Sequence, residues 1–408
     1  MRINHLELEN LGPFAQAGFN LHKRMNLLVG ENSAGKTAIL DALRVCLSKI
    51  LPQITASRSR PFLFGEEDIQ MLSDSMTVHC SFTFRNREFT YSARKNRTST
   101  YEKGLEPPDE ESFRPPLPGS IREYRKAVDQ PLGLFFSTGR STLSDASPSR
   151  VRVIGGQAAA FAGALVHREL RLQQIALRMG VLEAQSAESP LASGHLSALR
   201  DAAERFLPGC GNLRAEKSVR PRLVMDKEGM TLDPRQLSAG ERGILALVLD
   251  LAERLSLANP GLPDPVGDGS AIVLIDEIEL HLHPKRQRTI VRQLTETFRN
   301  CQFIATTHSP QIVAAVKPEQ VMLLKGGKVI RPTRTLGMDS NYILQSLMET
   351  DERSPEAAMA IEEVETLMKE WDLETARNLI AERRREGFDL PYWSVLEARM
   401  QRMEDLFE

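Results

Sequence analysis

The sequence predicts an α/β fold, and three observations lead to this prediction. The predicted strand 25–29 leads directly into the glycine-containing segment 30–37, and a helical pattern follows from residue 38. Residues 271–275 form an unbroken apolar run, which is typical of a parallel strand covered on both faces. Helical patterns separate such strands along most of the 408-residue chain, which is long enough for one large or two modest domains.

In the first half of the chain, alternating apolar and polar residues predict half-buried strands. Strands are expected at residues 3–10, 76–84 and 88–93, and a buried strand at 132–136. Residues 95–118 are rich in Pro, Glu, Arg and Ser, and we expect an exposed loop or insertion there. Residues 158–207 follow a helical pattern, which Pro190 and Gly194 are expected to break into at least two helices.

In the second half, strands and helices alternate before a helical tail begins. Strands are expected at 222–226, 271–275 and 302–306, helices at 243–257 and 284–299, a turn region at 261–269, and a hairpin at 321–330. Beyond Arg331 the patterns predict only helices, at 356–371, 374–386 and 392–406. The predicted organisation is an N-terminal core part at 1–157, a helical insertion at 158–210, a C-terminal core part at 211–335 and a helical extension at 336–408.

Composition limits the classes of function. The formal net charge is -2, so nucleic-acid binding would need a local basic patch. The four cysteines are scattered without a C-x-x-C pair, which favours reduced thiols over disulfides or a zinc site. Residues 1–14 lack a secretory pattern, and no apolar run approaches the length of a membrane span. We therefore expect a cytoplasmic protein without membrane contact.

Residues 30–37 form the first candidate site, a phosphate-binding loop. Gly30-Glu31-Asn32-Ser33-Ala34-Gly35-Lys36-Thr37 matches G-x-x-x-x-G-K-[ST] at every fixed position. Backbone N–H groups of such a loop turn toward phosphates, and the following helix N-terminus favours negative charge. Lys36 can reach the β- and γ-phosphates of ATP, and the Thr37 hydroxyl can bind Mg²⁺. The alternative, an ordinary glycine-rich turn, is disfavoured by the strand before the loop and the helix after it.

The second candidate site is the acid pair Asp276–Glu277, which follows the apolar run 271–275. A carboxylate at a strand end can hold Mg²⁺ directly or through water, and this role is assigned to Asp276. Glu277 would be the catalytic base that polarises the attacking water. Because side chains alternate along a strand, the two carboxylates are expected to point in different directions. The alternative is a strand end capped by solvated acids.

A third segment, Leu237-Ser238-Ala239-Gly240-Glu241, resembles the signature motif of ATP-binding-cassette ATPases. In that family the serine and the glycine amides lie at a helix N-terminus and contact the γ-phosphate bound by the opposite subunit. The resemblance therefore implies that Ser238, Gly240 and Glu241 bind ATP across a dimer. Small residues and a helix N-terminus suit this role, because they allow close backbone approach to an anion.

Two further residues are assigned through the same resemblance. His308, in Thr307-His308-Ser309, resembles the switch histidine that senses the γ-phosphate and the attacking water. Taken alone, it would more often be an ordinary surface or core histidine. Gln70 is the candidate for the metal-contacting glutamine, and Asp68 competes with it for this role.

Residues 276–284 indicate a branch of the family. Asp276-Glu277-Ile278-Glu279-Leu280-His281-Leu282-His283-Pro284 resembles the D-E-P-E-x-x-L-H-P stretch of RecF-, SMC- and OLD-like ATPases, with Ile278 in place of the usual proline. The resemblance suggests a dimer-interface role for His281 and His283 rather than a metal site. Residues 158–207 show no sustained heptad pattern, which argues against a long coiled-coil arm. The sequence most resembles the compact OLD-like ATPases of bacterial defence systems, such as the PtuA ATPases of the Septu type; residues 134–140 and 337–344 also resemble them.

The tail offers helices rather than a second active site. OLD nucleases carry a TOPRIM domain with a strand-end glutamate and a D-x-D pair, which residues 331–408 lack, and His308 is the last histidine. We therefore expect no nuclease within this chain. An apolar stripe consists of Ala357, Ala360, Ile361, Val364, Leu367, Met368, Trp371, Leu379, Ile380, Trp393 and Leu396. The stripe would either pack the helices on each other and on the core, or dock a partner. Arginines 383–385, and Arg122, Arg125 and Lys126, could touch nucleic acid, but a solvated face is the simpler explanation.

The resemblance implies an ABC-type P-loop ATPase head with a mixed sheet, a helical insertion and a helical C-terminal extension. ATP and Mg²⁺ would be bound by a head-to-tail homodimer or a higher oligomer. The expected function is a switch ATPase that regulates a partner nuclease or other effector in anti-phage defence, with nucleic-acid contact possible. The alternative is a RecF-like DNA repair or recombination ATPase that clamps DNA. A transporter motor is a third option, but the chain carries no signal of a membrane partner.

Overall fold

The computed structural model describes residues 1–98, 109–117, 130–141, 156–167, 172–216, 222–348 and 355–405, together with residues 123, 125 and 127. The chain divides into two compact units, Met1–Ile343 and Leu344–Glu408. In the described residues, the first unit contains three sheets with surrounding helices, and the second is helical. Residues Arg122 and Lys126 lie outside the described residues, and so does most of the segment between β5 and β6.

The central element of the first unit is a six-stranded sheet with the strand order β14-β13-β3-β12-β11-β7. Its strands are β3 (Met25–Gly30), β7 (Leu132–Phe136), β11 (Ala271–Ile275), β12 (Cys301–Thr307), β13 (Val321–Lys325) and β14 (Lys328–Ile330). All neighbouring pairs are parallel except β13 with β14, which form the predicted hairpin. β7, β11 and β12 are buried at every residue, which explains the continuous apolar runs of β7 and β11; β12 also contains the buried polar residues Gln302, Thr306 and Thr307. The sheet is mixed, as predicted.

A second, five-stranded antiparallel sheet has the order β2-β1-β4-β5-β6. Its strands are β1 (Arg2–Leu11), β2 (Phe14–Asn20), β4 (Ser75–Phe84), β5 (Arg87–Asn96) and β6 (Glu110–Arg114). β4 alternates strictly between buried and partly buried residues, and this alternation made it predictable. The expectation of a loop throughout residues 95–118 is wrong at β6, which pairs with β5. β6 is a charged edge strand without a buried residue, so no apolar alternation marks it in the sequence.

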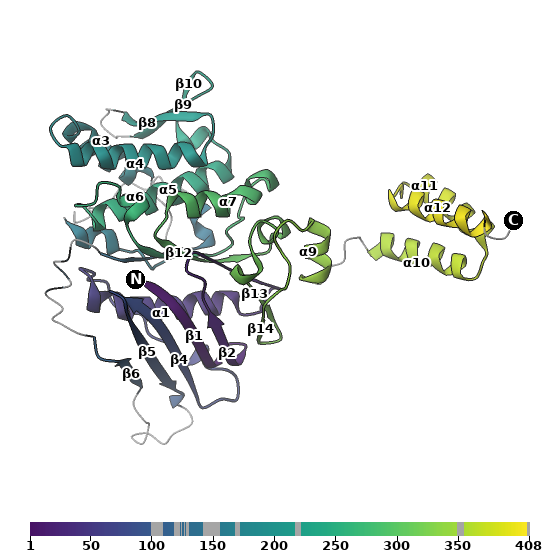
Figure 1. Ribbon diagram of the computed structural model, residues 1–408, viewed down its shortest axis with the longest axis horizontal. Coiled ribbons are helices and arrows are strands. Elements are labelled where there is room, and N and C mark those ends of the chain that lie inside the picture. The colour runs from purple at the N-terminus through teal and green to yellow at the C-terminus, as the bar shows by residue number, and fades with distance from the viewer. Residues whose placement is uncertain are drawn as a thin grey trace. The chain divides into compact units, whose positions relative to one another are not determined.

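Helix α1 (Lys36–Ile54) lies between these two sheets (Figure 1). One hydrophobic cluster joins residues of the antiparallel sheet, such as Leu8 and Phe82, to Leu43 of α1 and to Ile272 and Ile304 of the parallel sheet. Because α1 is covered on two sides, it buries most of its apolar residues and has no wholly solvated face. The position of α1 fixes the glycine-containing segment at its N-terminus against the parallel sheet.

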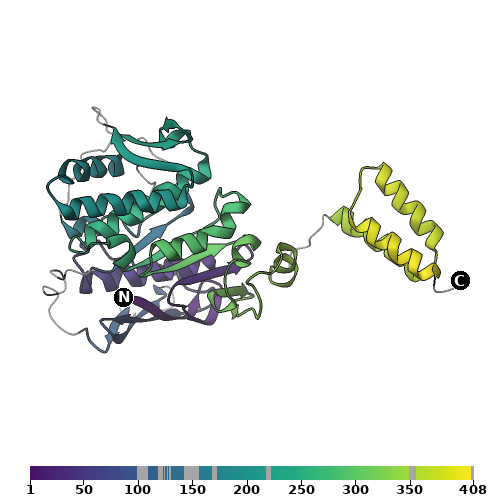
Figure 2. The same cartoon turned by 45° about the horizontal axis from the view of Figure 1, so that its top comes forward.

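The opposite face of the parallel sheet is covered by helices, with a small sheet beyond them (Figures 1 and 2). The helices are α3 (Leu172–Gln185), α4 (Pro190–Phe206), α5 (Ala239–Ala258), α6 (Pro265–Asp268) and α7 (Pro284–Thr297), and the small sheet is β8 (Cys210–Glu216), β9 (Arg222–Lys227) and β10 (Met230–Leu232). Pro190 begins α4 after the Ser189 cap, but Gly194 lies inside α4 and does not break it. A Cβ at Gly194 would lie 3.4 Å from the Pro263 carbonyl oxygen, which is an ordinary contact distance, so the packing there does not require a glycine. β8 and β10 were not predicted, because β8 is mostly partly exposed and β10 has only three residues.

Shorter elements connect these layers. They are the 3-10 helices η1 (Glu66–Asp68), η3 (Thr138–Ser141), η4 (Gln157–Phe161), η5 (Pro234–Gln236) and η6 (Pro318–Gln320), and the helices α8 (Pro310–Val313) and α9 (Ser340–Ser346). In the described residues, no helix is both long enough and apolar enough to cross a membrane.

The second unit consists of α10 (Pro355–Lys369), α11 (Leu373–Arg385) and α12 (Tyr392–Asp405). Its core contains most of the predicted apolar stripe, and Trp393 is fully buried with its Nε1 donating to the Phe388 carbonyl at 2.6 Å. Trp371 departs from the stripe: it is 52% exposed and has a left-handed backbone (φ 62°) at the end of α10. The stripe therefore packs these helices on each other.

Ion pairs within the second unit explain two of its three adjacent arginines. Arg383 pairs with Glu363 on α10 at 2.9 Å. Arg384 pairs with Glu397 on α12 at 2.7 Å. Arg383 and Arg384 thus join α11 to the two other helices of the unit. Because both are paired with glutamates, they are less available to bind nucleic acid.

Candidate nucleotide site

Three neighbouring parallel strands end at one edge of the six-stranded sheet and carry the predicted site residues there. β3 leads into the phosphate-loop segment 30–37, β11 leads into Asp276, and β12 leads into His308. Ile275 of β11 lies beside Ala305 of β12, and β12 pairs in turn with β3. The carboxyl ends of parallel strands form the usual ligand-binding edge of an α/β sheet. The tertiary structure therefore brings together segments that lie more than two hundred residues apart in the sequence.

Lys36 is held inside the phosphate-loop segment. It is the first residue of α1 and is only 8% exposed. Its Nζ donates hydrogen bonds to the carbonyls of Gly30 at 2.8 Å and Glu31 at 2.7 Å. The ammonium group therefore lies against the backbone of the loop, where phosphate oxygens could replace the two carbonyls as hydrogen-bond acceptors.

The loop glycines are also required by their surroundings. Gly35 has a left-handed backbone (φ 92°), and a Cβ there would lie 2.6 Å from the Phe14 ring. A Cβ at Gly30 would lie 2.6 Å from the carbonyl oxygen of Leu324 on β13. Glu31, Asn32, Ser33 and Thr37 are exposed, and Ala34 is partly buried. The loop is thus rigid at its two glycines and open to solvent between them.

Electrostatics link Lys36 to the acids on β11. Burial lowers the pKa of Lys36, while the carboxylates of Asp276, Glu277 and Glu279 raise it. Lys36 and these acids therefore belong to one local site, as the adjacent ends of β3, β12 and β11 also indicate. A phosphate group with a divalent cation would enter between these opposite charges.

The acid pair is arranged differently from what strand alternation predicts. β11 ends at Ile275, and Glu277 has a left-handed backbone (φ 48°). The backbone therefore leaves the strand conformation in a turn at the acid pair, so the alternation of the pleat does not extend to Glu277. Thr306 of β12 holds this turn: its hydroxyl donates to the Asp276 carboxylate at 2.7 Å and accepts from the Glu277 N–H at 2.7 Å.

Arg140 and Thr306 are functional candidates that the sequence analysis missed. Arg140 belongs to η3, after β7, and its guanidinium donates to the carbonyls of Asp276 and Glu277. Thr306 is fully buried in β12. The polar turn and arginine after strand 132–136 were a signal for Arg140, but a threonine within a buried strand gives no signal by itself.

His308 lies next to the acid pair but outside the core. It follows β12, its side chain is exposed, and its backbone N–H donates to Glu279 Oε1 at 2.6 Å. Ser309 then caps α8 by accepting a hydrogen bond from the Ile312 N–H at 3.3 Å. The imidazole is therefore free to face a ligand at this edge, while its backbone is fixed to the segment after β11.

The predicted signature segment begins helix α5. Ser238 is the N-cap: its hydroxyl accepts from the Glu241 N–H at 3.3 Å and donates to the Glu241 carboxylate at 2.9 Å. Glu241 also accepts from Lys227 at 3.2 Å and from Arg286 at 3.1 Å. Burial disfavours the charged form of Glu241, but the hydrogen bonds from Ser238 and Lys227 outweigh burial and hold its pKa below the usual value. Glu241 thus stabilises the helix start from within its own chain.

Gly240 packs tightly against the segment after β11. A Cβ at Gly240 would lie only 2.2 Å from the carbonyl oxygen of His281 and 3.5 Å from Cα of Leu282. The glycine is therefore explained by close backbone contact within one chain. This contact joins the start of α5 to the acid-bearing segment.

Asp68 and Gln70 lie near the start of α1. The Asp68 carbonyl accepts from the Gly12 N–H at 2.9 Å, and the Gln70 N–H donates to the Asn10 carbonyl at 2.8 Å. Gly12 in turn lies close to Ala38 of α1, because a Cβ there would be 3.5 Å from the Ala38 Cβ. Burial raises the pKa of Asp68, whose carboxylate accepts from the Gly65 N–H at 2.8 Å. The Asp68 carboxylate therefore serves its own turn, which leaves Gln70 as the metal-contact candidate.

The donor set fits Mg²⁺ bound together with a nucleotide. Thr37 offers a hydroxyl and Asp276 a carboxylate, which are hard oxygen ligands, and Mg²⁺ usually takes its other ligands from water and phosphate. In the described part of the chain, no cluster of three or more His, Cys, Asp or Glu side chains could hold a metal by itself. His281 and His283 are both exposed, and His283 caps α7 by accepting from the Lys285 N–H at 3.3 Å.

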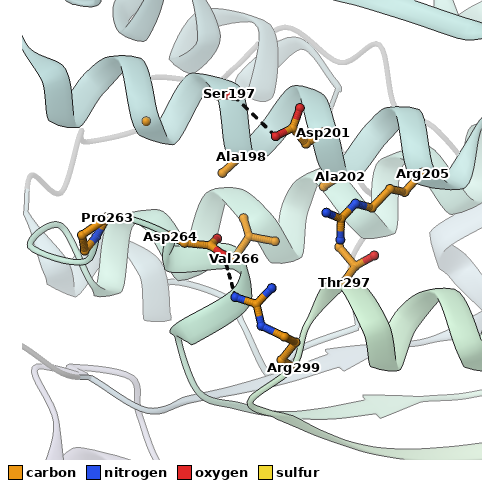
Figure 3. Close-up of a pocket in the computed structure, with 11 residues that line it drawn as sticks. Ser197, Ala198, Asp201, Ala202, Arg205, Pro263, Asp264, Val266, Thr297 and Arg299 are labelled. Carbon is orange, nitrogen blue, oxygen red and sulfur yellow. Dashed lines mark hydrogen bonds and ion pairs between the residues drawn. The ribbon is translucent and has the colours of Figure 1, made fainter.

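A separate pocket of about 280 Å³ lies between α4, α6 and the end of α7 (Figure 3). Arg299 pairs with Asp264 across it at 2.8 Å, and Ser197 donates to Asp201 at 3.4 Å. Its lining contains none of the phosphate-loop, signature or acid-pair residues. This pocket is therefore distinct from the candidate nucleotide site.

Two family models match the chain and agree with this site. One is described as "AAA domain" and matches residues 5–114, which include the phosphate loop. The other is described as "AAA domain, putative AbiEii toxin, Type IV TA system" and matches residues 206–314, which include the signature segment, the acid pair and His308. With the mixed sheet, these matches to AAA domain models indicate an α/β ATPase head, which a helical C-terminal region follows. The predicted fold class is confirmed.

Among curated proteins, the chain is similar to "Retron Ec83 probable ATPase" of Escherichia coli, with 44% identity over 162 residues, 40% of this chain and 30% of that protein. It is similar to "Retron Vc95 probable ATPase" of Vibrio cholerae serotype O1 biovar El Tor, with 25% identity over 90% of this chain and 84% of that protein. "Septu protein PtuA" of Bacillus thuringiensis is 33% identical over 26% of this chain and 29% of that protein. The chain thus spans less than a third of the first relative's length. The sequence analysis expected the chain to resemble the PtuA ATPases most. This expectation is corrected, because the matches to the retron ATPases extend over more of the chain.

Solved structures give more distant likenesses. The "SMC head domain from Thermotoga maritima" has a TM-score of 0.45 and 16% identity, and covers 82% of this chain and 100% of that chain. The structure titled "Structure of the recombination mediator protein RecF-ATPrS in RecFOR pathway" has a TM-score of 0.41 and 14% identity, over 81% of this chain and 98% of that chain.

Proposed function

We propose that this chain binds and hydrolyses ATP with Mg²⁺ as a switch ATPase. The observation that carries the proposal is the meeting of the phosphate loop, the acid pair and His308 at the ends of three adjacent parallel strands. Lys36 would bind the β- and γ-phosphates, and Thr37 and Asp276 would hold Mg²⁺. Glu277 would accept a proton from the attacking water, and His308 would contact the γ-phosphate. The ATPase names of the retron relatives support this assignment.

The proposed assembly is a head-to-tail homodimer in which Lys36 of one chain and Ser238 of the other hold one ATP. In the described residues, no hydrogen bond or ion pair joins segment 30–37 to segment 237–241 of the same chain. Among the residues that the structure describes, the N-terminus of α5 therefore makes no polar contact with the phosphate loop of its own chain. Glu241 already places one carboxylate at this helix start, and the helix N-terminus would also favour a γ-phosphate held by a second copy.

The proposed biological role is control of an associated nuclease or other effector in bacterial anti-phage defence. The support is the similarity to the retron ATPases, to PtuA and to an "OLD nuclease" of Thermus scotoductus, which is 24% identical over 74% of this chain and 58% of that protein. The helices of the second unit are candidates for the surface that docks the effector. ATP binding and hydrolysis would then alternate the head between two assembly states.

Substitution of Glu277 by Gln tests the catalytic assignment. We expect turnover to fall by about 10²–10⁴-fold, because the general base is lost. ATP affinity should stay within about threefold, and ATP should trap a dimer that light scattering detects. Glu296→Gln is the matched control, because Glu296 is exposed on α7 away from the acid pair. A Glu277→Gln protein that hydrolyses ATP at the wild-type rate would show that the base is another group.

Mixing two inactive variants tests the head-to-tail site. Lys36→Ala and Ser238→Ala should each lack activity, but their heterodimer contains one site with both residues intact. A mixture should recover about a quarter of wild-type activity, because half of the dimers are mixed and each has one good site. The double variant Lys36→Ala/Ser238→Ala, mixed with either single variant, is the control. A mixture that stays inactive would indicate a site completed within one chain.

A further inference from the structure

The backbone of Glu277 has an unusual conformation that something must maintain. Its φ of 48° lies in the left-handed region, which non-glycine residues rarely adopt because Cβ approaches the backbone. The direction of the Glu277 side chain depends on this conformation. Whatever holds the two peptide planes on either side of the Glu277 Cα also decides where its carboxylate points.

Arg140 contacts both of these peptide planes. Its Nη1 donates to the Asp276 carbonyl, and its Nη2 donates to the Glu277 carbonyl. The first carbonyl belongs to the plane before the Glu277 Cα, and the second to the plane after it. One planar guanidinium therefore fixes both φ and ψ of Glu277, which the single ammonium point of a lysine could not do in the same way.

The base of Arg140 is itself anchored. Arg140 follows β7, the neighbour of β11, and Phe136 lies beside Ile275 in the register. Nη1 of Arg140 also donates to the Ser137 carbonyl at 3.0 Å, and Arg140 is only 5% exposed. The arginine is thus part of a rigid support, with β7 on one side of the acid turn and Thr306 of β12 on the other.

The charge of Arg140 is maintained by the acids that it supports. Burial lowers its pKa to about 10, whereas the carboxylates of Asp276, Glu279 and Glu277 raise it. The guanidinium is therefore protonated at neutral pH, and every donor used on the acid turn is available.

Arg140 also borders the start of the signature helix. It lines a small void together with Ala239, Gly243 and Ile244 of α5 and Ile278 of the acid-bearing segment. Arg140 and the α5 start therefore face the same void, so a movement of the α5 start would change the space beside the residue that holds Glu277.

We propose that Arg140 is the positioning residue that aims the catalytic base Glu277 and links its orientation to the start of α5. This proposal rests on the proposed ATPase function. Arg140 contacts no reacting atom in this scheme. It acts through the backbone of Asp276 and Glu277, with Thr306 holding the same turn from the opposite side.

The test compares Arg140→Ala, Arg140→Lys and Thr306→Val with Thr306→Ser, which keeps the hydroxyl. We expect Arg140→Ala to lower kcat by about 10²-fold, because a misplaced catalytic group costs that much, with the Kd for a fluorescent ATP analogue changed less than about threefold. Arg140→Lys should recover little activity. Millimolar guanidinium should partly restore Arg140→Ala but not Glu277→Gln, and an equal concentration of urea should restore neither.

Hydrogen–deuterium exchange provides a readout that does not depend on turnover. Arg140→Ala should speed exchange in the peptide that covers residues 275–282, and Thr306→Ser should not. Unchanged exchange there, or a kcat within about threefold of wild type, would overturn the positioning role. Absence of ATPase activity in the wild-type protein would instead refute the proposed function, and the exchange result would still decide the role of Arg140. If Arg140→Ala does not fold, Arg140→Lys and Thr306→Val give the same comparison.

Discussion

Replacing Gly240 by alanine should destabilise the first unit, although alanine is the better helix former. The new Cβ would lie 2.2 Å from the His281 carbonyl oxygen and 3.0 Å from its carbon. These are backbone atoms, so no side chain can rotate away, and the helix or the acid-bearing segment must shift. Overpacking of this kind costs about 1–3 kcal/mol.

Gly243→Ala provides the matched control three residues further along α5. A Cβ at Gly243 meets no atom within 4 Å, so the substitution adds only the helix preference of alanine, up to about 1 kcal/mol. The difference between the two variants cancels that preference and should leave about 1–3 kcal/mol in favour of Gly243→Ala. Urea unfolding followed by circular dichroism measures it.

The comparison also separates two explanations for Gly240. Close packing within one chain predicts a loss of stability in the absence of nucleotide. A glycine needed only to approach the γ-phosphate of a second copy predicts normal stability and weaker ATP-driven dimerisation. Equal unfolding midpoints for Gly240→Ala and Gly243→Ala would refute the packing argument.

Three further outcomes are expected. Ser238→Ala should lower the free energy of unfolding by about 1 kcal/mol even without nucleotide, because an N-cap is lost; urea unfolding of the nucleotide-free protein checks it. The pKa of Glu241 is held below its ordinary value of 4.5, so its contribution to stability is present above that pH and is lost as pH falls through the lower, folded-state pKa. Unfolding curves between neutral and acid pH should show this component in wild type but not in Glu241→Gln. Trp393→Ala should cost the second unit about 3–5 kcal/mol, because Trp393 is fully buried; exchange rates in α10 to α12 would show the loss, and unchanged rates would contradict it.

Much of the fold could be predicted from local patterns. The strands β3, β11 and β12 are buried on both faces, so β11 appears as a continuous apolar run and β3 and β12 as mainly apolar segments. β4 shows alternation because one face is buried. β6, β8 and β10 escaped prediction because edge and surface strands are stabilised by hydrogen bonds to their neighbours, and these bonds leave no pattern in side-chain polarity.

By itself, the sequence determined where the motifs of the candidate site lie. The phosphate loop with Lys36 and the acid pair with Glu277 are continuous motifs whose residue types already predict their proposed roles. Only the tertiary structure decided how those groups are held. Arg140 and Thr306 reach the acid turn from the two strands beside β11, and Gly240 packs on the same segment from α5. These supports are contacts between backbone groups and residues that are far apart in the chain, so they exist only when strand order and register are known.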